Sequence, residues 1–413
     1  MRRRASRSWL LTLLLIAMSA GPVGAQVAVH GDTVYTMAGE PMHDAIVVTR
    51  DGKVVEIVPA AEAKLPKGTR LLRAKVVTPG LIDAHSVVGL AGYLNQSQDQ
   101  DQIDRSAAIQ PELRAVDAYN PRERLVEWLR GFGVTAIHTG HAPAALISGQ
   151  TMVVKTLDTT VEDALVSPFT TVATTLGNGG MVRDPKAGKG KGPGTRAKAI
   201  AMLRQELVKA GEYMKKRKTA KGDKRPARDL RMEALIPVLK RKVPLLVTAH
   251  RQHDILAALR LAEEFKILLV LDGAAEAYLV VKQIRESGFP VILHPPMMRS
   301  SGEAENATME LGVLLRRAGI RIAFQSGYES YVPKTRVVLF EAGVAAAHGL
   351  DFMSALEALT IEAARILGVD DRIGSLKPGK DADIALYDGD PLETTSHCIG
   401  VVINGEVVSA TPR

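Results

Sequence analysis

Several histidines stand at or just after the ends of apolar segments, where side chains leave a strand and meet at the rim of a parallel sheet. They are His85, His138, His141, His250, His253 and His294. Neutral imidazole is the commonest metal ligand in proteins. Each histidine taken alone is also explained as a hydrogen-bonded polar residue. As a set they exceed what core packing needs, and they predict a shared metal-binding pocket.

Apolar strands that alternate with helices must position these histidines. The strands are predicted at Val134 to His138, Thr151 to Thr156, Leu245 to Ala249, Ile267 to Leu271, Pro290 to Leu293 and Ile320 to Phe324. Helices are predicted around Val126, Leu207, Leu259, Val281, Leu314, Val344 and Leu356. This alternation is typical of a parallel α/β architecture.

Short β runs flank the alternating block on both sides. They are Val27 to Val29, Thr33 to Thr36, Ala45 to Thr49, Val54 to Val58 and Leu71 to Val77 before it, and Ile384 to Tyr387 and Val401 to Ile403 after it. We expect residues 26–78 and 377–413 to form one small, β-sandwich-like domain from both termini. The block at 79–376 is close in length to the ~250 residues of a (β/α)8 TIM-type barrel with an insertion.

Two motifs resemble the amidohydrolase superfamily, and in particular exported, imidazolonepropionase-like members. The first runs from Val77 to Ser86, as Val-Thr-Pro-Gly-Leu-Ile-Asp-Ala-His-Ser, and is similar to the first barrel strand of the family. The second comprises residues 360–368 and 374–384, where the barrel joins the small domain. The resemblance covers nearly the whole chain after residue 25. It implies a hydrolase in which a metal lowers the pKa of a bound water to about 7.

The resemblance also implies a set of metal ligands. His85 takes the position of the first histidine, His250 that of the histidine after strand five, and Lys155 that of a lysine that carries a carboxylate. Asp272 stands where the histidine after strand six is expected, and Val87 stands where the second histidine is expected.

The aspartate expected after strand eight falls near Gly327, where no carboxylate stands. We therefore expect a rearranged site of His85, His250 and His294, with Lys155 or Asp272 as its anionic member. It would bind Zn²⁺ or another divalent metal. The candidate substrate-binding residues are His141 and Gln325.

Two functions follow from this ligand set. The chain is either a hydrolase of carbon–nitrogen bonds in cyclic amides or small peptides, or a metal-free amidohydrolase-like protein that binds a ligand or partner without turnover. A small-molecule substrate is expected in the first case. Leu90 to Leu94 and Val332 to Phe340 could supply the apolar contacts of a homo-oligomer.

Composition excludes several other classes of protein. The chain has 413 residues, of which 46% are hydrophobic and 24% charged, as in a protein with a real core. The single cysteine, Cys398, excludes an internal disulfide. The aromatic content of 4% weakens any scheme that needs stacked bases, and we expect no nucleic-acid partner.

The positive charge is concentrated in an insert at residues 183–228. This insert has 16 Lys and Arg against 4 Asp and Glu, although the formal charge of the whole chain is only +8. Its Gly- and Lys-rich beginning predicts a mobile loop, and its later residues predict a helix with Leu203, Leu207 and Ala210 on one face. The insert is either a solvated helix or a surface for acidic lipids or polyanions.

The first 25 residues have the three parts of a signal peptide. Arg2, Arg3, Arg4 and Arg7 precede an apolar run from Leu10 to Ala20, and Val23-Gly24-Ala25 is a small-residue cleavage site. The run is shorter than the ~20 residues that span a bilayer, and no later segment is long enough. We therefore expect a cleaved signal and an exported, periplasmic protein, and the export route stays open.

Overall fold

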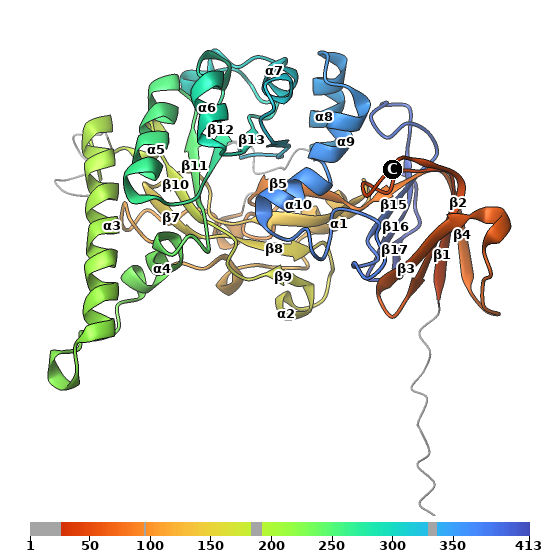
Figure 1. Cartoon of the computed structure of the whole chain (residues 1–413), viewed down its shortest axis with the longest axis horizontal. Coiled ribbons are helices and arrows are strands. Elements are labelled where there is room, and N and C mark those ends of the chain that lie inside the picture. The colour runs from red at the N-terminus through yellow and green to blue at the C-terminus, as the bar shows by residue number, and fades with distance from the viewer. Residues whose placement is uncertain (1–25, 95, 183–191, 329–336) are drawn as a thin grey trace, which may run out of the picture.

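The computed structural model describes residues 26–94, 96–182, 192–328 and 337–413 (Figure 1). The predicted signal peptide, most of the Gly- and Lys-rich run, and part of the Val332 to Phe340 stretch lie outside these residues. None of the helices in the described ranges is both long enough and apolar enough to pass through a bilayer.

Strands from both ends of the chain share one seven-stranded sheet, at the right of Figure 1. Its order is β17-β16-β15-β4-β1-β2-β3. The strands are β1 (Val27–Val34), β2 (Met42–Arg50), β3 (Lys53–Pro59), β4 (Arg70–Pro79), β15 (Ile384–Tyr387), β16 (Cys398–Ile403) and β17 (Glu406–Ser409). Alternating side chains such as Val47, Val77 and Ile384 form its core. The sequence led us to expect a β-sandwich-like domain. In the structure these seven strands are hydrogen-bonded side by side in one sheet.

The middle of the chain forms two further sheets. The six-stranded sheet has the order β14-β13-β12-β11-β10-β7, and the four-stranded sheet has the order β5-β6-β8-β9. Their strands are β5 (Leu81–Ser86), β6 (Val134–Thr139), β7 (Ile147–Gln150), β8 (Met152–Lys155), β9 (Leu165–Ser167), β10 (Val172–Thr175), β11 (Leu245–Ala249), β12 (Leu269–Gly273), β13 (Val291–Leu293) and β14 (Ile322–Ala323). Neighbouring strands from β10 to β14 pair in parallel, as do β5 and β6.

The mixed α/β class is confirmed, whereas one closed barrel is not shown. Strand β7 is antiparallel to β10, and β8 is antiparallel to β6, so the chain changes sheet between them at Thr151. Backbone hydrogen bonds connect the two sheets at their margins, from Thr151 to Thr171 (3.0 Å) and from Ala84 to Phe324 (3.0 Å). The ladders themselves remain two open sheets.

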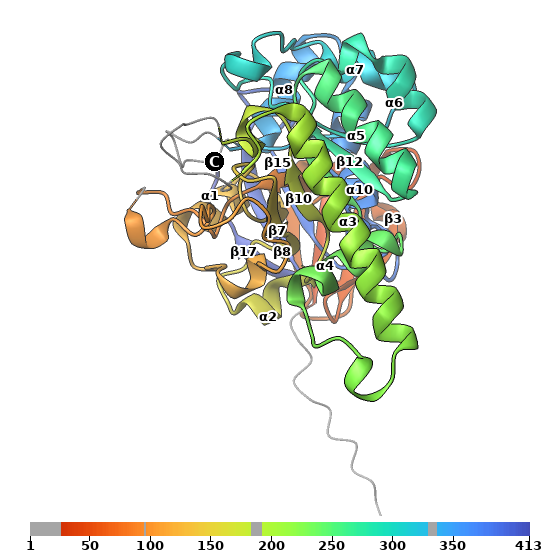
Figure 2. The same cartoon turned by 90° about the vertical axis from the view of Figure 1, so that its left-hand side faces the viewer.

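Helices cover the outside of these sheets (Figures 1 and 2). They are α1 (Arg124–Arg130), α2 (Val161–Ala164), α3 (Arg196–Thr219), α4 (Leu230–Leu239), α5 (Gln252–Phe265), α6 (Val281–Ser287), α7 (Leu311–Arg317), α8 (Val338–Ala347), α9 (Phe352–Ala358) and α10 (Ile361–Leu367). The predicted apolar face of α3 is confirmed, since Leu203, Leu207 and Ala210 are buried. Thr195 begins this helix, where its hydroxyl accepts a hydrogen bond from the Lys198 backbone.

Candidate functional site

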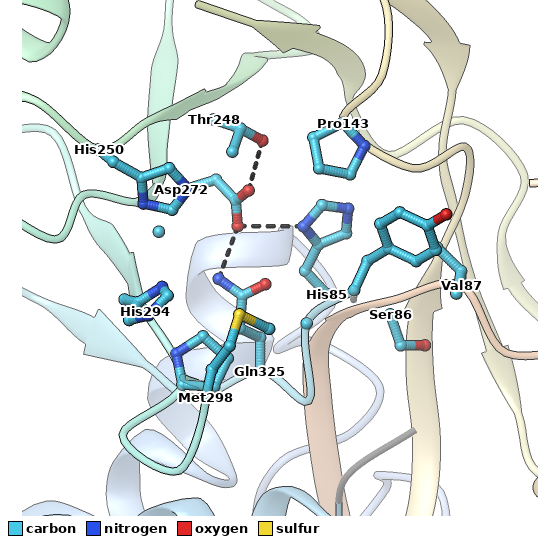
Figure 3. A pocket seen from close by; sticks show the side chains of 14 residues that line it. His85, Ser86, Val87, Pro143, Thr248, His250, Asp272, His294, Met298 and Gln325 are labelled. Carbon is cyan, nitrogen blue, oxygen red and sulfur yellow. Dashed lines mark hydrogen bonds and ion pairs between the residues drawn. The ribbon is translucent and has the colours of Figure 1, made fainter. Parts of the chain in front are cut away.

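One cavity lies beyond the carboxyl ends of β5, β11, β12 and β13 (Figure 3). Its volume of about 40 Å³ can hold a water molecule or a small reacting group. Its lining residues come from six separate segments: His85, Ser86, Val87, Pro143, Thr248, His250, Asp272, Gly273, His294, Pro295, Met298, Gln325, Gly327 and Tyr328. The carboxyl ends of parallel strands are where active sites of this architecture gather.

The register of β11 against β12 places Thr248 beside Asp272. The two residues are paired across the parallel ladder, and the Thr248 hydroxyl donates to Asp272 Oδ2 at 2.5 Å. Gln325 Nε2 donates to Asp272 Oδ1 at 2.8 Å and to the Leu293 carbonyl at 3.0 Å. These donors fix the carboxylate at the floor of the cavity (Figure 3).

The same carboxylate also holds His85. The His85 Nδ1–H donates to Asp272 Oδ1 at 3.0 Å, and both side chains are buried. Burial lowers the pKa of His85, but the charge and hydrogen bond of Asp272 more than offset it, so the pKa lies above its usual value. His85 Nε2 is buried and has no hydrogen-bond partner among the described residues.

The ionised state of Asp272 follows from the same contacts. Burial raises its pKa, but the charge and hydrogen bond of His85 and the Thr248 hydroxyl lower it further, and the net pKa lies below its usual value. The buried pair is therefore a carboxylate facing an imidazole that readily takes a proton.

His250 and His294 form the opposite wall. Their rings meet edge to face, with centroids 5.3 Å apart. A side chain on Gly273, whose φ is +74°, would place its Cβ 2.5 Å from His250 Cε1, so glycine leaves room for the ring. Burial lowers the pKa of His250, and its Nδ1 has no hydrogen-bond partner within the described ranges.

Asp83 anchors the end of β5, which carries His85. One oxygen of its buried carboxyl group accepts from the backbone N–H groups of His85 (3.2 Å) and Ser326 (3.0 Å). Burial raises its pKa to about 6. The ends of β5 and β14 are thereby tied together below the cavity.

The prediction that Lys155 belongs to this site is wrong. Its ammonium group lies between Asp381 and Asp383, at 2.8 and 2.9 Å, and also donates to Asn404. Strand β8 runs antiparallel to β6, so its last residue lies toward the seven-stranded sheet and away from the rim. The anionic residue in the cavity is Asp272.

The other histidines have separate environments. His138 Nδ1–H donates to the Ala84 carbonyl at 2.6 Å, and its Nε2 accepts from the Thr151 hydroxyl at 2.6 Å. Burial lowers the pKa of His138 to about 3, so it is a neutral residue of the core. His141 is buried but does not line the cavity, whereas Gln325 does.

The donor types suit zinc, but their arrangement does not. No group of three His, Cys, Asp or Glu side chains in the described ranges is placed to hold a metal ion. The one carboxylate of the cavity already accepts hydrogen bonds from His85, Gln325 and Thr248. The position of the second family histidine is occupied by Val87, which packs with Ala91 and Ala142.

Sequence reasoning missed Thr248 and the apolar walls of the cavity. Thr248 could have been found, because it lies two residues before His250 on one strand and side chains at that spacing share a face. Pro143, Met298 and Tyr328 come from loops whose path no periodicity describes.

Known sequences similar to this chain are amidohydrolases. A family model described as the amidohydrolase family matches residues 314–409. The amidohydrolase tasK of Hapsidospora irregularis is 24% identical over 86% of this chain, which spans 38% of the length of that relative. An imidazolonepropionase from Shewanella baltica is 30% identical over 31% of the chain and 32% of its own length.

Solved structures resemble the whole chain. A Thermotoga maritima amidohydrolase has a TM-score of 0.86 and 28% identity, over 93% of this chain and all of its own. A zinc-bound adenosine deaminase from Xanthomonas campestris shares the fold alone, with a TM-score of 0.55 and 17% identity over 93% of this chain and 92% of its own. The family model, the relatives and the whole-chain likeness thus all point to the amidohydrolase superfamily, which the motifs at residues 77–86 and 360–384 also resemble.

Proposed function

We propose that the protein hydrolyses a carbon–nitrogen bond of a small amide at the cavity of His85, His250, Asp272 and His294. One observation carries the proposal: a buried carboxylate orients an imidazole whose second nitrogen has no hydrogen-bond partner among the described residues. A base that is oriented by a third group is the recurring arrangement for activating water or another nucleophile.

In this proposal His85 is the general base. With its proton on Nδ1 and directed to Asp272, His85 Nε2 can accept a proton from a water molecule in the cavity as that water attacks the carbonyl carbon. Asp272 stabilises the imidazolium that forms, and Thr248 and Gln325 keep the carboxylate in place. The imidazolium can then return the proton to the leaving nitrogen.

A metal-activated water is the alternative that the family suggests. It is not part of the proposed steps, because the described residues do not offer three converging ligands. Three imidazoles and a carboxylate surround the cavity, so the metal content of the protein separates the two schemes.

The lining favours a neutral substrate. Pro143, Pro295, Met298 and Val87 give apolar walls, and neither lysine nor arginine is among the described lining residues. A substrate carboxylate would therefore lack a cationic partner there. This supports cyclic amides over free dipeptides, whose terminal carboxylate needs a cation.

The test is a comparison of dihydrouracil, a neutral cyclic amide, with glycyl-proline, a charged dipeptide. We expect hydrolysis of the cyclic amide, and a loss of about 10²–10⁴-fold in kcat for His85→Gln. His253→Gln is the matched control, because His253 is exposed and does not line the cavity. Equal activity of both variants would remove His85 from the mechanism, and ligand binding without turnover would favour the non-catalytic alternative.

Elemental analysis separates the two water-activating schemes. We expect less than about one-tenth equivalent of zinc per chain after growth with added zinc, because three-ligand binding is not preformed. One zinc ion per chain that is lost in His250→Ala would replace the proposal with metal-assisted hydrolysis.

Export is the remaining part of the proposal and rests on residues 1–25, with their four arginines, apolar run and Val23-Gly24-Ala25 site. Cell fractionation and sequencing of the mature N-terminus test it. A periplasmic protein that begins at Gln26 is expected, and a cytoplasmic protein that retains the arginines would contradict it.

A further inference from the structure

A cluster of cations without counter-charges lies at the far end of α3 and in the loop that follows it. This cationic tip consists of Lys215, Lys216, Lys218, Lys221, Lys224 and Arg225. All six residues are exposed, and none forms an ion pair with the described part of the chain. Asp223 is the one acidic residue between the first and the last of them.

Several other cations on or beside α3 and α4 are paired with carboxylates. Arg204 pairs with Glu264 at 2.8 Å, and Lys209 (3.0 Å) and Arg231 (3.2 Å) share Glu206. Near the tip itself, Arg228 pairs with Glu233 at 2.6 Å. Carboxylates thus pair with these four cations but, in the described part of the chain, with none of the six cations of the tip.

The tip projects away from the rest of the molecule. In Figures 1 and 2 the last turns of α3 extend past α4, and the loop at residues 220–229 returns the chain to α4. Lysines in the last turn of a helix are also explained by the helix dipole. That explanation covers Lys216 and Lys218 but not Lys221, Lys224 and Arg225, which follow the helix.

We propose that the cationic tip docks the protein on an anionic phospholipid surface. Lysine is a mobile point charge that suits a fluid layer of phosphates, and four to eight such charges are typical of lipid-binding clusters. Leu230, which is 61% exposed at the base of the loop, supplies an apolar contact beside them. A single-stranded nucleic acid fits less well, because the tip offers no aromatic side chain for base stacking and Tyr213 is buried.

Vesicle sedimentation of the protein from Gln26 to Arg413, without the predicted signal peptide, tests the proposal. The vesicles contain phosphatidylcholine alone or with one third phosphatidylglycerol, so the measured quantity is the gain in binding that the anionic lipid gives. A variant that replaces four tip residues by glutamine should lose at least about tenfold in this gain. The replaced residues are Lys215, Lys218, Lys221 and Lys224.

A matched control variant removes the same charge elsewhere. Its four replaced lysines are exposed, and none of them forms an ion pair in the described structure: Lys64, Lys67, Lys75 and Lys377. The control should keep its anionic-lipid gain, and added salt should abolish the gain of both wild type and control. Equal losses in both variants would overturn the proposal. Tip-dependent binding to duplex DNA, without binding to either vesicle, would overturn it as well.

Discussion

At the scale of single residues, Asp272 decides the protonation of His85. Burial alone would lower the pKa of the imidazole, and the carboxylate reverses the direction. The sequence predicted both residues, His85 from its place at a strand end and Asp272 from the family resemblance. It did not predict that they bond to each other, since that contact depends on which strands face one another across the cavity.

Asp272→Asn should therefore move the pKa of His85 from above to below its usual value of about 6.5. The asparagine keeps the shape of the side chain but removes the charge, so burial becomes the dominant cause. NMR titration of the histidine rings measures the midpoint, and the His85→Gln spectrum identifies the signal. An unchanged His85 midpoint would refute the role given to Asp272.

At the scale of elements, apolar content decides which strands the sequence reveals. Strand β11 was predicted at its observed bounds from Leu245-Leu246-Val247, and the apolar face of α3 and the helix around Leu259, now α5, were predicted as well. Strand β10 was missed, although it is buried and lies between β7 and β11. Its Val-Ala-Thr-Thr sequence is polar by composition, and only the β-branched shape of threonine and valine indicates a strand.

The polar side chains of β10 lower the stability of the fold by a measurable amount. The hydroxyl of Thr174 is buried and lacks a hydrogen-bond partner in the described structure. Thr174→Val keeps the branched shape and removes that group, so it should raise the free energy of unfolding by about 1 kcal/mol. Denaturant titration measures the change. Thr151→Val is the contrasting control, because the Thr151 hydroxyl donates a hydrogen bond to His138. Losing this hydroxyl should lower the free energy of unfolding by about 1–3 kcal/mol.

At the scale of the whole molecule, Lys155 connects the four-stranded sheet to the seven-stranded sheet. Its partners Asp381 and Asp383 immediately precede β15, and Lys53 of β3 and Arg372 also contact Asp381. The sequence placed Lys155 at a strand end correctly but could not give the direction of that strand. Direction follows from the antiparallel pairing with β6, a contact that local patterns do not encode.

The ion pairs of Asp381 make the free energy of unfolding depend on pH. Burial raises the pKa of Asp381, but Lys155, Lys53 and Arg372 more than offset it and lower the pKa to about 2 from 3.8. Ionised Asp381 therefore stabilises the fold above about pH 4, and this stabilisation is lost as pH falls through about 2. Burial raises the pKa of Asp383, so that group acts in the opposite direction. The test is the difference between wild type and Asp381→Asn, whose unfolding free energy should fall less steeply between these pH values.

Replacing Lys155 should lower the free energy of unfolding far more than replacing the exposed Lys53. Lys155 and Lys53 both contact Asp381, at 2.8 and 2.5 Å, but the Lys155 side chain is 2% exposed and the Lys53 side chain 49%. Lys155→Met leaves two buried carboxylates without their shared cation, and we expect a loss of about 3–5 kcal/mol in the free energy of unfolding. Lys53→Met removes a contact that water already screens, and about 0–1 kcal/mol is expected. Chemical denaturation of both variants at neutral pH measures these costs. Equal losses would mean that the exposed pair, rather than burial of Lys155, holds the two sheets together.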